Sequence, residues 1–140
     1  MPTSSRSDRA WVAAQLALMA ATAATWFVDD GVTRLGFVPA ALGAGLAGWA
    51  LRALGRSLSP YPTPPRDAEL VARGPFRFLR HPTYVGGVLF FAGLSLVFSR
   101  WGLVATGVLA VFWFFKARAE ERRLSARFPG YAEYRRRTWF

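Results

Sequence analysis

Two short segments carry the side chains best suited to chemistry. The first runs from Arg80 to Gly86 and reads Arg-His-Pro-Thr-Tyr-Val-Gly. Pro82 suits the first position of a helix, where a missing N–H is no loss, and a helix N-terminus attracts anions. The segment predicts a site for a carboxylate or phosphate beside His81, with the Tyr84 ring available for an aromatic base. Gly86 would let the ligand lie close to the helix.

The second segment is an acidic pair, Glu120-Glu121, within strongly basic surroundings. Two adjacent carboxylates could hold an ammonium group or ribose hydroxyls. Helical spacing offers a simpler interpretation, in which Glu120 pairs with Lys116 or Arg123, and Glu121 with Arg118. Exposed pairs of this kind contribute little to stability. Both interpretations stay open at this point.

A third segment lies near the end of the chain. Its arginine and tyrosine side chains would be able to fold back over a ligand as a lid; they are Arg127, Tyr131, Tyr134 and Arg135. The three adjacent arginines 135–137 favour contact with lipid headgroups.

The elements that must position these segments are helices. Four apolar stretches predict transmembrane helices at about 10–28, 35–55, 82–99 and 101–117, since a crossing needs about 20 residues and at least about 17. Only Ser99 and Arg100 separate the last two, which predicts a tight hairpin. A cytoplasmic helix is expected over about 118–137, interrupted at Pro129-Gly130. We therefore expect an all-α integral membrane protein of one domain, 1–140.

The charge pattern orients these helices. The net charge is +10, and 16 of the 18 basic residues are expected on one side of the membrane, with only Arg34 and Arg100 on the other. By the positive-inside rule, both termini and the loop between the second and third stretches are cytoplasmic, in the inner or plasma membrane. The segregation favours lipid headgroups over nucleic acid as the partner of the basic residues. A signal peptide ending near 21–23 is the competing interpretation of the first stretch.

The composition narrows the chemistry. The chain has no cysteine and one histidine, His81, which excludes disulfides and thiolate nucleophiles and predicts no metal site. An exporter is disfavoured because such proteins usually need an ionisable group within the membrane, and none of the stretches has an acid in its middle. A non-enzymatic scaffolding subunit remains an alternative.

Taken together, the motifs resemble the isoprenylcysteine carboxyl methyltransferase and phospholipid methyltransferase superfamily. The resemblance runs from about Leu58 to Tyr134. It rests on the segment 80–86 with Gly74-Pro75 before it, on Glu120-Glu121-x-x-Leu124, and on the ending 128–134. It implies S-adenosylmethionine as the methyl donor, bound on the cytoplasmic side, and a lipophilic acceptor that arrives from the bilayer.

The resemblance also implies roles for individual residues. The cofactor pocket would be lined by His81, Pro82, Tyr84 and Gly86. The adenine and ribose of the cofactor would contact Leu70, Val71, Gly74 and Pro75. Its polar end would be held by Glu120 and Glu121. Arg80, Tyr84 and Glu121 are the catalytic candidates: Arg80 to steer an anionic acceptor, and Glu121, His81 or Tyr84 to take a proton.

The acceptor stays open among a phospholipid amine, an isoprenoid-linked carboxylate, a small thiol and other lipophilic groups. The protein would act as a monomer, or as a homodimer formed through the Gly/Ala face of the second stretch.

Overall fold

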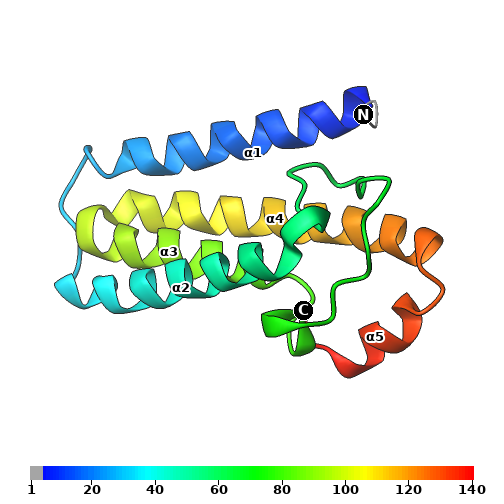
Figure 1. Cartoon of the computed structure of the whole chain (residues 1–140). Coiled ribbons are helices and arrows are strands. Elements are labelled where there is room, and N and C mark those ends of the chain that lie inside the picture. Colours follow the sequence, from blue (N-terminus) through cyan, green and yellow to red (C-terminus); the bar gives the residue numbers. More distant parts are fainter. Residues whose placement is uncertain (1–4) are drawn as a thin grey trace.

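The computed structural model describes residues 5–140 (Figure 1). Along the chain the elements are α1 (Arg6–Thr25), η1 (Arg34–Gly36), α2 (Phe37–Leu54), η2 (Gly55–Ser57), η3 (Gly74–Arg77), α3 (Pro82–Phe98), α4 (Arg100–Arg127) and α5 (Tyr131–Arg137). Within residues 5–140 no strand forms, and the only extended pairing is an isolated bridge between Leu79 and Trp139. The all-α prediction is therefore confirmed for this part of the chain.

Polar side chains set the helix ends. α1 begins at Arg6 because Ser5 and Asp8 form a capping box, each side chain bonding the other's backbone N–H. Ser99 ends α3, and its hydroxyl accepts the Gly102 N–H at the start of α4. The hairpin predicted at Ser99 is thus confirmed. Asp29, in the segment after α1, accepts from the Ser99 hydroxyl and pairs with Arg100.

Glycines bring α2 and α3 together. A Cβ added to Gly86 would lie 2.7 Å from the Gly43 carbonyl oxygen of α2, and one added to Gly93 would lie 2.4 Å from the Ala40 nitrogen. Small residues at these crossings let the two backbones touch, as in membrane helix pairs. On the other side of α3, Phe91 packs with Leu109 and Trp113 of α4 in the buried core.

Two segments are long and apolar enough to cross a membrane. They are Arg34–Ser57 and Arg100–Arg127, each with a mean hydropathy of 1.4, and only 22% and 39% of their apolar windows are buried inside the protein. A core helix of a soluble protein would be mostly buried, so these exposed apolar faces suit lipid. α3 is apolar but has 17 residues. Crossing by all four long helices stays a prediction.

The ends of the helices that carry the basic residues meet at one end of the bundle. Figure 1 shows the start of α1, the end of α2, the start of α3 and the end of α4 on the same side, with α5 folded against them. The helix predicted over 118–137 is divided: α4 continues without a break to Arg127, and α5 is a separate helix after Phe128, Pro129 and Gly130. The division follows from Pro129, which cannot continue a helix that needs its N–H.

Candidate functional site

Arg80 and Glu121 form the centre of the polar cluster at this end of the bundle. The Arg80 Nε lies 2.7 Å from Glu121 Oε1, and His81 Nε2 lies 3.3 Å from the same oxygen. Arg80 Nη1 also donates to the carbonyls of Arg135 and Thr138, on and just after α5. The guanidinium therefore joins the start of α3, the end of α4 and the C-terminal segment.

Glu120 makes a different set of contacts. The Tyr84 hydroxyl donates to Glu120 Oε1 at 2.6 Å, and His81 Nδ1 lies 3.7 Å from Glu120 Oε2. His81 is thus placed between the two carboxylates, and its ring stacks on Tyr84 with a centroid separation of 5.7 Å. The helical-spacing pairs are longer, at 4.0 Å for Lys116 to Glu120 and 3.8 Å for Arg118 to Glu121. The two acids therefore bind mainly to the segment 80–84 rather than to neighbours on α4.

The environments of the two acids push their pKa values in opposite directions. Both lie beyond the apolar part of α4. Burial raises the pKa of Glu120, although the Tyr84 hydrogen bond and the nearby His81 oppose it. Hydrogen bonds from His81 and Arg80 outweigh burial at Glu121 and lower the pKa of Glu121 to about 2. Glu120 is therefore the better proton acceptor near neutral pH, and Glu121 the more permanent anion.

Behind Tyr84 lies a buried lysine. Lys116 Nζ donates to Gln15 Oε1 at 2.6 Å and to the Pro60 carbonyl at 3.0 Å, and it stands 5.5 Å from the centre of the Tyr84 ring. Trp113 Nε1 donates to the same Gln15 oxygen, at 3.2 Å. The cluster therefore holds buried charges of both signs, each with partners.

Two narrow cavities adjoin this cluster beneath the loop 58–73, which we call the strap. One of about 140 Å³ is lined by Tyr61, Pro62, Arg80, His81, Tyr84 and Glu120, among others. The other, of about 90 Å³, is lined by Leu70, Val71, Phe76, Arg80, Tyr131 and Tyr134, among others. They share several lining residues, including Leu54, Phe76 and Leu124. The larger cavity has a mixed polar and apolar lining that includes the charged cluster, whereas the smaller one is a mainly apolar slot.

Comparison with known proteins decides the family. Residues 32–130, which include both chemical segments, match the sequence model of the phospholipid methyltransferase family. The chain belongs to this family. Its membership confirms the resemblance to the isoprenylcysteine/phospholipid methyltransferase superfamily, suggests a membrane methyltransferase and supports association with a membrane.

Two relatives are named as metal resistance proteins. The chain is 35% identical over 103 residues to the cobalt-zinc-cadmium resistance protein CzcN of Cupriavidus metallidurans. It is 33% identical over 102 residues to the nickel-cobalt-cadmium resistance protein NccN of Alcaligenes xylosoxydans xylosoxydans. Each match covers 71% of this chain and 48% of the relative, so the chain spans about half the length of these curated relatives. No solved structure matches the chain.

In this phospholipid methyltransferase family member, the predicted site residues fall into three groups. The cavity walls contain Leu70, Val71, Arg80, His81, Tyr84 and Glu120. Glu121 contacts Arg80 and His81 but lines neither of the two cavities. It lines a separate groove with Trp11, Phe114 and Arg118. The remaining predicted residues shape the backbone and line neither of the two cavities; they are Gly74, Pro75, Pro82 and Gly86.

Backbone conformation and close packing explain why glycine or proline stands at positions of this third group. Gly74 has a positive φ of 59° and lies against Trp49 and Ala53 of α2, so a side chain there would be strained and crowded. Gly86 faces α2 rather than the strap, so its close approach is to a helix. Pro82 begins α3 as predicted, but two N–H groups of the first turn are not free to meet an anion. Tyr84 and Val85 both donate to the His81 carbonyl.

Two neighbours of the site, Gln15 and Thr63, escaped the sequence analysis. Gln15 was the sole amide in an apolar run, a signal that its side chain needs a buried partner. Thr63 donates to Asp8, which also pairs with Arg123, and so fastens the strap to α1 and α4. Nothing in the sequence pattern marks Thr63, because its partner lies 55 residues away.

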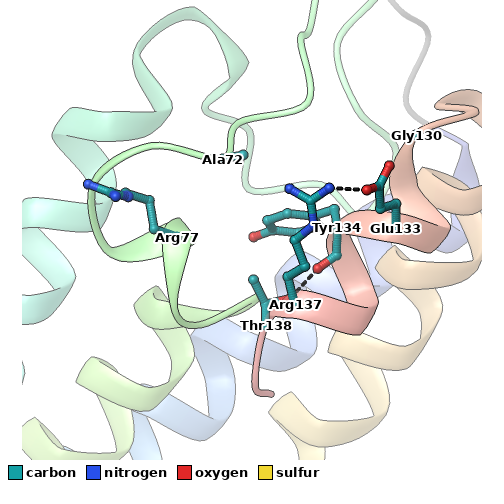
Figure 2. Close-up of a pocket in the computed structure, with 7 residues that line it drawn as sticks. All are labelled: Ala72, Arg77, Gly130, Glu133, Tyr134, Arg137 and Thr138. Carbon is teal, nitrogen blue, oxygen red and sulfur yellow. Dashed lines mark hydrogen bonds and ion pairs between the residues drawn. The ribbon is translucent and has the colours of Figure 1, made fainter.

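A wider pocket lies outside the apolar slot. It measures about 430 Å³ and is lined by Ala72, Arg77, Gly130, Glu133, Tyr134, Arg137 and Thr138. Figure 2 shows the Tyr134 ring at its centre and Arg137 paired with Glu133. Tyr134 lines both this pocket and the slot, and its hydroxyl donates to the Phe76 carbonyl at 2.8 Å. The ring is thus a wall between the two spaces.

Proposed function

We propose that this protein transfers a methyl group from S-adenosylmethionine to a lipophilic or membrane-associated acceptor. The observation that carries the proposal is the convergence of Arg80, His81 and Tyr84 on Glu120 and Glu121 beside two cavities, within a chain of a methyltransferase family. When bound, adenosylmethionine would supply an electrophilic methyl group on a sulfonium.

The residues present fit this cofactor. Its amino-acid end carries an ammonium and a carboxylate, and the cluster offers Glu120 on one side with Arg80 and His81 on the other. Charge-assisted hydrogen bonds to such groups are strong. Its nucleoside is flat and partly apolar, which suits the slot walled by Leu70 and Val71. We assign Glu120, not Glu121, to the ammonium, because Glu121 is already held by Arg80 and His81.

The protein's work in the reaction is alignment and, for an amine acceptor, removal of a proton. Methyl transfer is an in-line displacement. The acceptor's lone pair forms the new bond to the methyl carbon as the carbon–sulfur bond breaks, and the electron pair of the broken bond stays on sulfur. Holding the partners in line contributes several kcal/mol, at most about 7–11. Because Glu120 is assigned to the cofactor ammonium, His81, which lies between the two carboxylates, would take the proton of an ammonium acceptor. A carboxylate acceptor would need no base.

Calorimetric titration with S-adenosylhomocysteine tests the proposal. The protein would be compared with Glu120→Gln, and with Arg34→Ala as a control at the opposite end of the bundle. We expect saturable binding by the wild type and Arg34→Ala, and weaker binding by Glu120→Gln. No binding by well-folded wild type in both detergent and lipid would contradict the proposal and favour the non-enzymatic scaffolding alternative.

The acceptor is a second question within the same proposal. The family match favours a phospholipid amine as the alternative to an isoprenoid-linked carboxylate. The names of the two relatives concern metal resistance and name no acceptor. Incubating the protein with labelled methyl donor and fractionated lipids would separate the classes. Product lability in mild base identifies a methyl ester, and base-stable label in an amine headgroup identifies an N-methyl product.

A further inference from the structure

Tyr131 stands out among the buried polar groups. It is the first residue of α5, only 1% of its surface is exposed, and its ring packs beside Tyr134 with a centroid separation of 5.8 Å. Within residues 5–140, its hydroxyl is the one buried side-chain oxygen or nitrogen without a hydrogen-bond partner. Buried hydroxyls in folded proteins are almost always paired, so a single exception calls for a specific reason.

The position of Tyr131 supplies that reason. Its side chain lines the slot of about 90 Å³ together with Arg80 and the strap residues Leu70 and Val71. The slot also includes the polar residues Ser57 and Glu69, and its remaining walls are mainly apolar. The Tyr131 hydroxyl is covered in the ligand-free protein, so a ligand reaches it when the strap moves outward. Burial raises the pKa of the Tyr131 hydroxyl, and the nearby Glu121 adds to the effect. The hydroxyl is therefore protonated and able both to donate and to accept.

Tyr134 provides a direct contrast within the same helix. It is another tyrosine of α5 and lines the same slot, yet its hydroxyl is engaged by the Phe76 carbonyl. The difference shows that α5 can satisfy a phenol where the fold requires one. The unpaired hydroxyl of Tyr131 is thus a property of its place in the slot.

We propose that the Tyr131 hydroxyl is a ligand-binding group that hydrogen-bonds to the nucleoside part of adenosylmethionine. This inference rests on the proposed function. Once the strap moves outward, a flat base would fit between the apolar walls of the slot. A phenol that is both donor and acceptor matches the edge of a purine or a ribose hydroxyl. α5 is then part of the binding site as well as an anchor at the membrane surface.

The Tyr131→Phe variant tests the inference by binding and by thermal unfolding. Removing an unpaired hydroxyl leaves the ligand-free protein with an unchanged or higher Tm, because no internal bond is lost. Affinity for S-adenosylhomocysteine should fall about 3- to 10-fold, the loss expected for one hydrogen bond, and the ligand-induced rise in Tm should shrink. Tyr134→Phe is the matched control and should lower the Tm of the ligand-free protein instead.

A second ligand locates the contact. 5′-Methylthioadenosine keeps the nucleoside but lacks the amino-acid end, so Tyr131→Phe should weaken its binding by the same factor. Loss of affinity for S-adenosylhomocysteine alone would overturn the assignment to the nucleoside. Equal affinity of wild type and Tyr131→Phe for both ligands would overturn the inference while leaving the proposed function intact. Absence of wild-type binding to either ligand would overturn the function and the inference together.

Discussion

Arg80 Nε and Glu121 Oε1 lie 2.7 Å apart, which ties the first residue of the Arg-His-Pro segment to the acidic pair 41 residues later. Both side chains are largely shielded, with 13% and 6% of their surfaces exposed. The contact therefore joins the start of α3 to the end of α4 more firmly than an exposed ion pair would. It also orients Glu121 so that Glu120, the next residue, meets Tyr84.

The hydrogen bonds of Glu121 with His81 and Arg80 predict a specific pH dependence for stability. The pKa of Glu121 is lowered to about 2 in the folded protein, so its stabilisation is complete above its unfolded pKa of about 4.3 and is lost as pH falls toward 2. Glu121→Gln should therefore lower the Tm at pH 7, and the difference from wild type should narrow between pH 5 and pH 3. Thermal unfolding in detergent, followed by circular dichroism at each pH, measures the Tm of the wild type and of Glu121→Gln. A difference that stays constant with pH would contradict the prediction.

Opening of the strap should limit ligand exchange. The two cavities are smaller than the roughly 300–1000 Å³ of ordinary ligand pockets, so the strap must move outward for a nucleoside to enter. Arg127 fastens it through the carbonyls of Pro64 and Arg66. Arg127→Ala should raise both the association and dissociation rates of S-adenosylhomocysteine several-fold, with a smaller change in Kd.

Stopped-flow measurement of the two rates checks the strap prediction. Arg137→Ala is the matched control, because Arg137 is an exposed arginine that pairs with Glu133 outside the strap. Unchanged rates in Arg127→Ala would show that ligands enter by another route.

Gly86 and Gly45 form a matched pair for the packing of α2 against α3. A Cβ at Gly86 would meet backbone atoms of Gly43 and Ala47 within 2.8 Å, whereas one at Gly45 would meet nothing within 4 Å. Gly86→Ala should destabilise the protein by about 1–3 kcal/mol through overpacking. Gly45→Ala should be neutral or slightly stabilising, since alanine favours a helix. Thermal unfolding of both variants tests this difference. Equal Tm values for Gly86→Ala and Gly45→Ala would refute the close packing at Gly86.

Gln15 should be needed for stability even though it lies outside the two cavities. Its Oε1 accepts from Lys116 and from Trp113. Gln15→Leu removes the shared acceptor and leaves buried donors unsatisfied, with an expected loss of about 1–3 kcal/mol. Gln15→Glu keeps an acceptor next to the ammonium and should lose less. Tryptophan fluorescence during unfolding follows the change, and a Gln15→Leu protein as stable as wild type would show that water replaces the amide.

Sequence patterns predicted much of the fold because hydrophobicity and helix ends are local properties. The hairpin at Ser99, the helix start at Pro82 and the break at Pro129 each depend on neighbouring residues alone. The approach of Arg80 and His81 to Glu121 was implied by a resemblance rather than by spacing. Without it, the ordinary pairing of Glu121 with Arg118 was equally reasonable.

What the sequence could not predict depends on which helix faces which. Gly86 has the composition expected beside a ligand, yet the orientation of α3 turns it toward Gly43 of α2. Tyr131 and Tyr134 are both tyrosines that follow the Pro129-Gly130 break within one helical turn. Only the folded position of α5 separates a phenol with a partner from one without.

The hydrogen bonds from Arg80 to the carbonyls of Arg135 and Thr138 can form only after these two residues have been synthesised. All four long helices leave the ribosome before those two residues do, so helix insertion and bundle assembly can begin while Arg80 still lacks these partners. The polar cluster around Arg80 is then completed only after all four long helices have been synthesised. A nascent chain stalled before residue 131 would carry the helices without a finished site.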